Sequence, residues 1–402
     1  MTAPGNRMAF SAPRAADDDG PAPGAPRATT TPAVYTWEAT DEQVSQRYGV
    51  PLQDVVRFDL NTSPTPPDFV AKVLAAGRFE TALSEYPPSD YRRLTAAAAE
   101  RYQVDPGEIV VGAGADEILD MIARAFLQPG GTAVIPVPSY GMYRVVTEQR
   151  TGQVIAVPRL GSDAGYAVDI EATRAAARRA DLVWLCSPNN PTALAEPDGA
   201  VARLLDGLAA DAEDDDRTPP AVCLDEAYAE FTGTTLLPLR ARYPRLIVVR
   251  TLSKAYALAG LRVGFAIAPR QTLAAIEPYR PPGSVSTVSV TVATEALRDP
   301  AVLETNRSRV VMERDRLAAS LVALGWSPGP SVTNFLLVVF GSRGHATDVA
   351  EHLLRSGLVP RTFPPTHPLA DHLRITVRSP LEDDRLIAAA TSFEASHPRS
   401  EG

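Results

Sequence analysis

The stretch RTLSKAYALAGLRVGF (250–265) places a lysine in a loop between two short apolar runs. Lysine is otherwise scarce, because the only lysines among the 39 basic residues are Lys72 and Lys254. Lys72 belongs to an amphipathic segment and is interpreted as a surface charge. A lone lysine in a loop is usually also a surface charge, but arginine cannot replace lysine where chemistry needs a deprotonatable amine. Apolar neighbours should partly desolvate Lys254 and favour its neutral, nucleophilic form.

Apolar, β-branched runs recur outward from this loop. They are IVVGAG (109–114), TAVIPVP (132–138), QVIAVPR (153–159), LVWLCSP (182–188), AVCLDEA (221–227), LIVVRTL (246–252) and VGFAIAP (263–269). Helical segments such as ADEILDMIARAFL separate several of them. Continuous apolar strands of this kind indicate a sheet covered by helices on both faces. The fold class is therefore α/β, with ligand chemistry expected at the carboxyl ends of strands.

The order of predicted helices and strands indicates the domain organisation. A long helix (roughly 288–324) is followed by NFLLVVF (334–340), a helix at 346–356, GLVPRTF (357–363) and LRITV (373–377). This α+β pattern predicts a second, smaller domain. The predicted parts are a disordered tail (1–32), an arm that joins the small domain (33–60), a large domain (61–285), the small domain (286–395) and a final tail (396–402).

Composition excludes several classes of function. The net charge of −9 and pI near 5.2 argue against a nucleic-acid partner. Neither a membrane-length apolar run nor the apolar core of a secretory signal is present. Cys186 and Cys223 lie in separate apolar strands without metal-ligand spacing, so we expect reduced thiols, no metal and a cytoplasmic location.

A carboxylate follows one of the predicted strands in LDEAYAEF (224–231). Burying Asp225 there is costly without a cationic partner. A protonated pyridine nitrogen would be such a partner, and the pairing would keep the ring cationic as an electron sink. Tyr228 can donate its phenol to an acceptor on the same ring. The alternative is a helix-capping Asp and a packed Tyr.

Other strand ends carry polar or aromatic groups. GAGADE (112–117) allows close backbone approach, and the N–H groups of Ala115 and Asp116 open a helix as an anion site. SPNNPT (187–192) offers an Asn amide to a ring oxygen, and in PSYGMY (138–143) Tyr140 can stack on a flat cofactor. Each feature also has a plain alternative as a turn or as core packing. The residues around Lys254 that suit an anion are Thr251, Ser253 and Arg262.

These motifs, in this order, resemble fold-type I pyridoxal-phosphate (PLP) enzymes, specifically the histidinol-phosphate aminotransferase family of class I/II aminotransferases. The resemblance covers about residues 35 to 392 and implies a mixed seven-stranded sheet plus a small α+β domain. It implies that Lys254 is the Schiff-base lysine and Asp225 the partner of the pyridine nitrogen. Tyr228 and Asn190 match the groups on the ring hydroxyl, and Tyr140 matches the residue that stacks on the ring.

The resemblance also implies sites for phosphate and substrate. Tyr86 matches a tyrosine that reaches the phosphate of a neighbouring subunit, which implies a homodimer. Arg374 and Arg361 match arginines at the substrate's anionic group, and Asn61 stands in the segment that closes over the substrate. The residues that match the phosphate cup are Ala115, Asp116, Thr251, Ser253 and Arg262.

Two segments depart from the family pattern at positions that do not touch the cofactor chemistry, and the first of them lies near the substrate. NTSP (61–64) replaces the usual Asn-Glu-Asn-Pro, and Ala193 replaces the usual Gly after Asn-Pro-Thr. The expected activity is amino transfer between histidinol phosphate, or a related or aromatic amino compound, and a 2-oxo acid such as 2-oxoglutarate. The alternatives are a phospho-amino-acid decarboxylase of the same subfamily or a secondary-metabolite aminotransferase. A transcription regulator would need a DNA-binding module ahead of the enzyme fold, and an inactive scaffold would not need the full set of cofactor residues.

Overall fold

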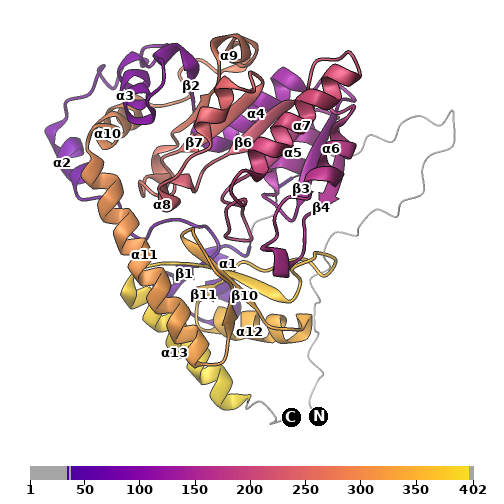
Figure 1. The fold of residues 1–402 in the computed structure, drawn as a ribbon. Coiled ribbons are helices and arrows are strands. Elements are labelled where there is room, and N and C mark those ends of the chain that lie inside the picture. Colours follow the sequence, from indigo (N-terminus) through magenta and orange to yellow (C-terminus); the bar gives the residue numbers. More distant parts are fainter. Residues whose placement is uncertain (1–33, 36–37, 398–402) are drawn as a thin grey trace, which may run out of the picture. The chain divides into compact units, whose positions relative to one another are not determined.

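The structure is a computed structural model, and the residues it describes are 34–35 and 38–397 (Figure 1). The predicted tail at 1–32 and most of that at 396–402 lie outside these residues. The strands are β1 Val56–Arg57, β2 Ile109–Gly112, β3 Thr132–Val137, β4 Gln153–Pro158, β5 Leu182–Cys186, β6 Ala221–Asp225, β7 Leu246–Thr251, β8 Gly264–Ile267, β9 Ser327–Pro328, β10 Phe335–Val339, β11 Leu358–Val359 and β12 His372–Thr376. The α-helices are α1 Asp41–Tyr48, α2 Phe69–Ala76, α3 Arg92–Tyr102, α4 Gly114–Phe126, α5 Met142–Gln149, α6 Ile170–Ala177, α7 Ala200–Asp214, α8 Ala229–Thr232, α9 Arg270–Ile276, α10 Thr287–Arg298, α11 Pro300–Ala323, α12 Arg343–Arg355 and α13 Pro380–Ser396.

The predicted apolar runs form one seven-stranded sheet with the order β2-β8-β7-β6-β5-β3-β4. Strands β7, β6, β5, β3 and β4 pair in parallel, whereas β8 is antiparallel to both of its neighbours. The α/β class and the mixed seven-stranded sheet are thereby confirmed. The carboxyl ends of β5, β6 and β7 lie side by side, which gathers the loops that follow them at one edge.

Helices cover both faces of this sheet, and alternate strand residues point into two cores. On β6, for example, Val222 and Leu224 pack with α3, α7 and α10, whereas Cys223 packs with α4, α5 and α9 on the other face. The strands read as continuous apolar runs because both of their faces are buried.

The C-terminal part has its own core around β10, which pairs antiparallel with β12 and β9. The arm near the N-terminus joins this core, because β1 pairs in parallel with β11. Helix α11 packs along α13 and against β10 (Figure 1).

One expectation for this part was wrong: the segment 288–324 is not a single helix. It divides into α10 and α11 at Asp299, whose extended backbone ends one helix and whose side chain caps the next. Pro300 explains the break, because proline disfavours helical backbone in the residue before it and is suited to the first turn of a new helix.

Within the described residues, no helix combines the length and the apolar character that crossing a bilayer requires.

Candidate active site

A pocket lies where the loops after β5, β6 and β7 meet residues from both ends of the chain. Every predicted site residue except Tyr86 lines it. These residues are Asn61, Ala115, Asp116, Tyr140, Asn190, Asp225, Tyr228, Thr251, Ser253, Lys254, Arg262, Arg361 and Arg374. The sequence reasoning therefore located the pocket, although the role of each residue is not tested by its position alone.

Lys254 is partly buried in the loop that follows β7. Its amine donates to the backbone carbonyl of Asn61 at 3.2 Å and lies 3.4 Å from that of Leu60. Burial, followed by the positive charge of Arg374, lowers the pKa of Lys254 to about 8. No carboxylate lies within ion-pairing distance of this amine in the described chain. A substantial neutral fraction near pH 8 makes it a competent nucleophile.

Asp225 ends β6 and is buried. Its carboxylate accepts hydrogen bonds from the Tyr143 hydroxyl at 2.8 Å and from the Ala227 N–H at 2.9 Å. Burial raises the pKa of Asp225 to about 6, and these two hydrogen bonds act in the opposite direction. Both of these donors are neutral, so neither hydrogen bond balances the negative charge of the carboxylate, and a cation beside it would be stabilised.

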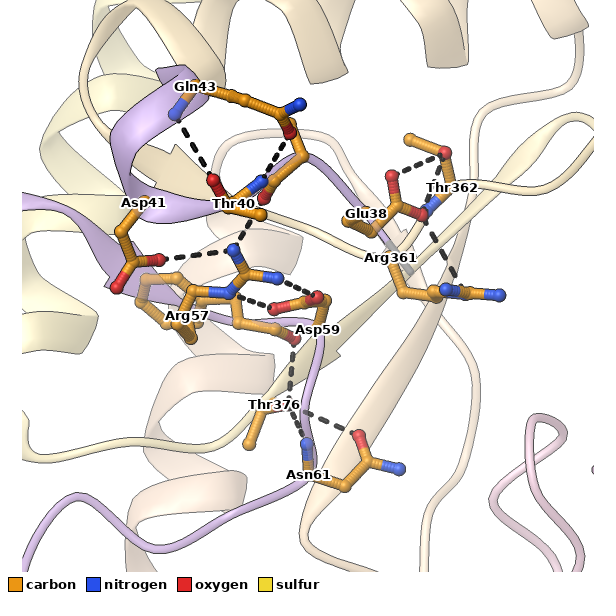
Figure 2. Close-up of polar contacts among 12 residues, drawn as sticks. Glu38, Thr40, Asp41, Gln43, Arg57, Asp59, Asn61, Arg361, Thr362 and Thr376 are labelled. Carbon is orange, nitrogen blue, oxygen red and sulfur yellow. Dashed lines mark hydrogen bonds and ion pairs between the residues drawn. The ribbon is translucent and has the colours of Figure 1, made fainter. Parts of the chain in front are cut away.

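Asn61 connects the arm to the rest of the pocket. It adopts a left-handed backbone with φ of 53°, and its N–H donates to the Thr376 hydroxyl at 3.0 Å. Its side-chain amide donates to the Tyr228 hydroxyl at 2.9 Å, and its carbonyl also accepts from Asn334 at 3.0 Å. The segment from Asp59 to Asn61 is further held by Arg57, which pairs with both Asp41 and Asp59 (Figure 2).

Two arginines occupy the side of the pocket formed by the C-terminal part. Arg374 and Arg361 pair through their backbones. The Arg374 side chain is buried, donates to Asn190 Oδ1 at 2.5 Å and to the Asp59 carbonyl, and has no carboxylate within 4 Å in the described chain. Its Nε has no partner among the described residues. Arg361 lies 3.7 Å from Glu38, which also accepts from Thr362 (Figure 2). The guanidinium of Arg374, buried and without a carboxylate partner among the described residues, is suited to an anionic ligand.

The start of α4 also lines the pocket, through Ala115 and Asp116. Gly114 has φ of +82°, and a Cβ on it would lie 2.5 Å from Nη2 of Arg262. Asp116 accepts from the Tyr140 hydroxyl at 3.1 Å and pairs with Arg262 at 3.3 Å. The free N–H groups of a helix start, together with Arg262 and the hydroxyls of Thr251 and Ser253, form a suitable anion site.

Sequence reasoning missed several contributors. Tyr35, Asp59 and Cys186 also line the pocket. Tyr143 does not line the pocket, but its hydroxyl donates to Asp225. The spacing of Tyr140 and Tyr143 in SYGMY was a usable signal, since the two residues belong to one turn, in which the Tyr143 N–H donates to the Tyr140 carbonyl at 3.3 Å. The Tyr86 side chain is 90% exposed and stands outside the pocket of its own chain.

Comparison with known proteins agrees with the geometry. The family model for aminotransferase class I and II matches residues 54–391. Histidinol-phosphate aminotransferase of Roseiflexus castenholzii is 34% identical over 362 residues, which covers 88% of this chain and 93% of that protein. The Xylella fastidiosa (strain 9a5c) enzyme of the same name is 36% identical over 322 residues, 78% of this chain and 85% of its own length.

Among solved structures, histidinol-phosphate aminotransferase from Sinorhizobium meliloti in complex with pyridoxal-5'-phosphate matches with a TM-score of 0.79 and 26% identity. The match covers 90% of this chain and 96% of that one. The chain therefore belongs to the class I and II aminotransferases, a PLP-dependent family, and within it to the family of the histidinol-phosphate aminotransferases.

Proposed function

We propose that this aminotransferase moves an amino group between histidinol phosphate, or a related and possibly aromatic amino compound, and a 2-oxo acid such as 2-oxoglutarate. The observation that carries the proposal is that the Lys254 amine and the buried Asp225 carboxylate line one pocket together with the buried guanidinium of Arg374. The first two suit the cofactor, and the third suits an anionic substrate.

The residues of the pocket fit PLP. Asp225 is a buried acid whose hydrogen-bond donors among the described residues are both neutral, which suits a cationic ring nitrogen. Gly114 and Gly264 allow close packing at the helix start, because a Cβ on Gly264 would lie 2.5 Å from the Gly114 carbonyl carbon and a Cβ on Gly114 would lie 2.5 Å from Nη2 of Arg262. A phosphate can approach such a helix start closely. When bound, PLP supplies an aldehyde that reacts with amines and a protonated ring that withdraws electrons.

We assign the holding roles as follows. Lys254 would hold the aldehyde carbon and Asp225 the ring nitrogen, while Tyr228 and Asn190 would hold the ring hydroxyl and Tyr140 the ring face. The phosphate is held by the N–H groups of Ala115 and Asp116 and by the side chains of Thr251, Ser253 and Arg262.

Lys254 also serves as the base of the reaction in this proposal. Its Nζ would take the proton from the α-carbon of the amino donor. A pKa of about 8, set mainly by burial, keeps a useful neutral fraction near physiological pH. The carbonyls of Leu60 and Asn61 accept its N–H groups and orient its lone pair.

Substrate contacts are assigned to the C-terminal part and the arm. Arg374 binds an anionic group of the substrate, Arg361 binds beside it, and Asn61 closes over the site. The domain division at 61–285 and 286–395, with the arm at 33–60 attached to the smaller part, belongs to the same proposal and is supported by the pairing of β1 with β11.

The proposal includes a homodimer with shared sites in the cytoplasm. Tyr86 is 90% exposed and Leu83 is 67% exposed, as expected of side chains that reach a second subunit. The two cysteines are free thiols in the sheet, which suits a reducing compartment.

A half-reaction screen tests the substrate. The PLP-loaded protein is mixed with histidinol phosphate, aromatic amino acids and phospho-amino acids, and the absorbance change to pyridoxamine phosphate is followed, with Lys254→Ala as the blank. Conversion by histidinol phosphate, and its loss in Arg374→Gln, supports the assignment. Release of carbon dioxide without conversion of the cofactor contradicts it.

A further inference from the structure

Tyr143 is a fully buried tyrosine on α5 whose hydroxyl reaches the end of a neighbouring strand. It donates to Asp225 Oδ2 at 2.8 Å, while the Ala227 N–H donates to Oδ1 at 2.9 Å. Each carboxylate oxygen therefore has one donor and keeps a lone pair for a further ligand. Tyr143 does not line the pocket, so its contact with the ligand can only be indirect.

The surroundings hold the Tyr143 ring in one position. It stacks on Trp184 with a centroid distance of 5.4 Å and an interplanar angle of 7°. The indole N–H of Trp184 donates to the Thr147 hydroxyl at 3.1 Å, and that hydroxyl donates to the Tyr143 carbonyl at 2.7 Å. Tyr140, on the same turn, meets Tyr143 edge to face at 5.7 Å. The turn that leads into α5 thus carries both a pocket-lining ring and the donor to Asp225.

The other charged or titratable groups near Asp225 do not replace this donor. Cys186 on β5 and Cys223 on β6 are buried thiols whose pKa burial raises, so they are neutral. Asp116 on α4 disfavours the charged form of Asp225, whereas Lys254 favours it only through space. Tyr228 follows on the same loop and donates no bond to Asp225 in the described structure. Tyr143 and the Ala227 N–H are the direct donors among the described residues.

We propose that Tyr143 is a positioning residue that keeps Asp225 ionised and aimed at the ring nitrogen of bound PLP, an inference that rests on the function proposed above. A buried carboxylate that loses a donor is protonated more readily and holds a cationic partner less well. Tyr143 thereby sets how strongly the ring withdraws electrons without touching cofactor or substrate.

Tyr143→Phe tests this role because it keeps the ring stacked on Trp184 and removes only the hydroxyl. Tyr243→Phe is the matched control, since Tyr243 is also buried and its hydroxyl donates at 2.9 Å to the carbonyl of Pro220, which precedes β6 at the end of that strand opposite to Asp225. Neither Tyr243 nor Pro220 lines the pocket. Three quantities are measured for both variants and the parent: the PLP dissociation constant between pH 6 and 8.5, the half-reaction rate constant, and the concentration of amino donor that gives half of this rate.

Tyr143→Phe is expected to bind PLP about 10- to 100-fold more weakly, the effect of losing a hydrogen bond to a charged group. The deficit should grow as the pH falls toward 6, because Asp225 then protonates earlier than in the parent. The half-reaction rate constant should fall while the half-saturating donor concentration stays within about twofold, since no substrate contact is lost. Tyr243→Phe should match the parent in all three.

If Tyr143→Phe has the same PLP affinity and pH profile as Tyr243→Phe, the positioning role is refuted. The proposed function is unaffected by that result as long as the parent protein binds PLP through Lys254. If the parent itself takes up no PLP on Lys254, both proposals fail together. Should Tyr143→Phe not fold, Trp184→Phe removes the stacking partner and the Thr147 bond but leaves the hydroxyl. It is expected to give a smaller loss with the same pH dependence, and an unchanged affinity would overturn the inference.

Discussion

The backbone carbonyl of Asn61 lies 3.2 Å from the amine of Lys254. The residues are separated by 193 positions, and Asn61 reaches this place in a left-handed conformation that Thr376 and Asn334 hold from the C-terminal part. The arm therefore contributes a wall of the pocket and an acceptor for its central amine.

Replacement of Asn61 should separate side-chain bonding from backbone strain. Asn61→Gly removes the side-chain hydrogen bonds to Tyr228 and Thr376, keeps the backbone N–H bond to Thr376 and tolerates a φ of 53°. Asn61→Ala removes the same bonds and adds strain, so it should lower the free energy of unfolding by about 1 kcal/mol more than Asn61→Gly. Urea denaturation compares the two, and equal stabilities would contradict the strain argument.

The two lysines of the chain allow a direct test of cofactor attachment. Borohydride reduction in the presence of PLP should leave the cofactor's mass on the peptide that contains Lys254 and none on that with Lys72, which is exposed. Lys72→Ala should keep full activity, whereas Lys254→Ala should lose at least about 1000-fold in turnover because the essential nucleophile is gone. Mass spectrometry of the digest decides, and labelling of Lys72 alone would exclude the assignment.

Cofactor uptake should depend on pH through the Lys254 amine. Its pKa is lowered to about 8, mainly by burial and next by Arg374. The neutral form reacts, so the rate of PLP uptake by the apoprotein should rise with pH and level off above about 8. In Arg374→Gln one lowering influence is removed, the pKa rises, and the inflection should move to higher pH. Stopped-flow absorbance measures both curves; an inflection that moves downward would be inconsistent with this electrostatic account.

The lack of a side chain at Gly114, the first residue of α4, should be essential for binding the phosphate. Gly114→Ala places a Cβ 2.5 Å from Arg262 at φ of +82° and should weaken PLP binding at least about tenfold. Gly77→Ala is a control, because Gly77 also has positive φ, +59°, but has nothing within 4 Å of its added Cβ. Both variants should lose stability through strain, and only Gly114→Ala should lose cofactor affinity in a fluorescence titration.

A second buried acid should shape stability rather than activity. Asp383 is fully buried at the start of α13, and burial together with nearby Glu313 raises its pKa to about 8. An acid whose pKa is raised in the folded state contributes stability below its unfolded pKa, near 4, and loses that contribution as the pH rises to about 8.

Asp383→Asn should therefore reduce the fall in unfolding free energy between pH 4 and 8. Asp384→Asn is the neighbouring control, since that carboxylate is 61% exposed. Urea unfolding at several pH values measures the slope, and an undiminished slope in Asp383→Asn would count against the assigned pKa.

The sequence by itself determined the sheet and the identity of the residues at its edge. Each strand is buried on both faces and so reads as a continuous apolar run, and a polar residue that ends such a run, such as Asp225, must lie at the edge of the sheet. The scarcity of lysine then singled out Lys254. These signals are local, and each lies within one element and its following loop.

Only the tertiary structure decided which distant residues meet. The antiparallel direction of β8, the bond from Arg374 to Asn190 across 184 positions, and the contact of Tyr143 with Asp225 depend on how separate elements pack. Such contacts arise when apolar faces are buried together, and this burial is set by the whole set of elements rather than by any one of them. The sequence contains a signal for the helix break at Asp299, because Pro300 follows it. The prediction of a single helix relied instead on the helical pattern on both sides of this proline.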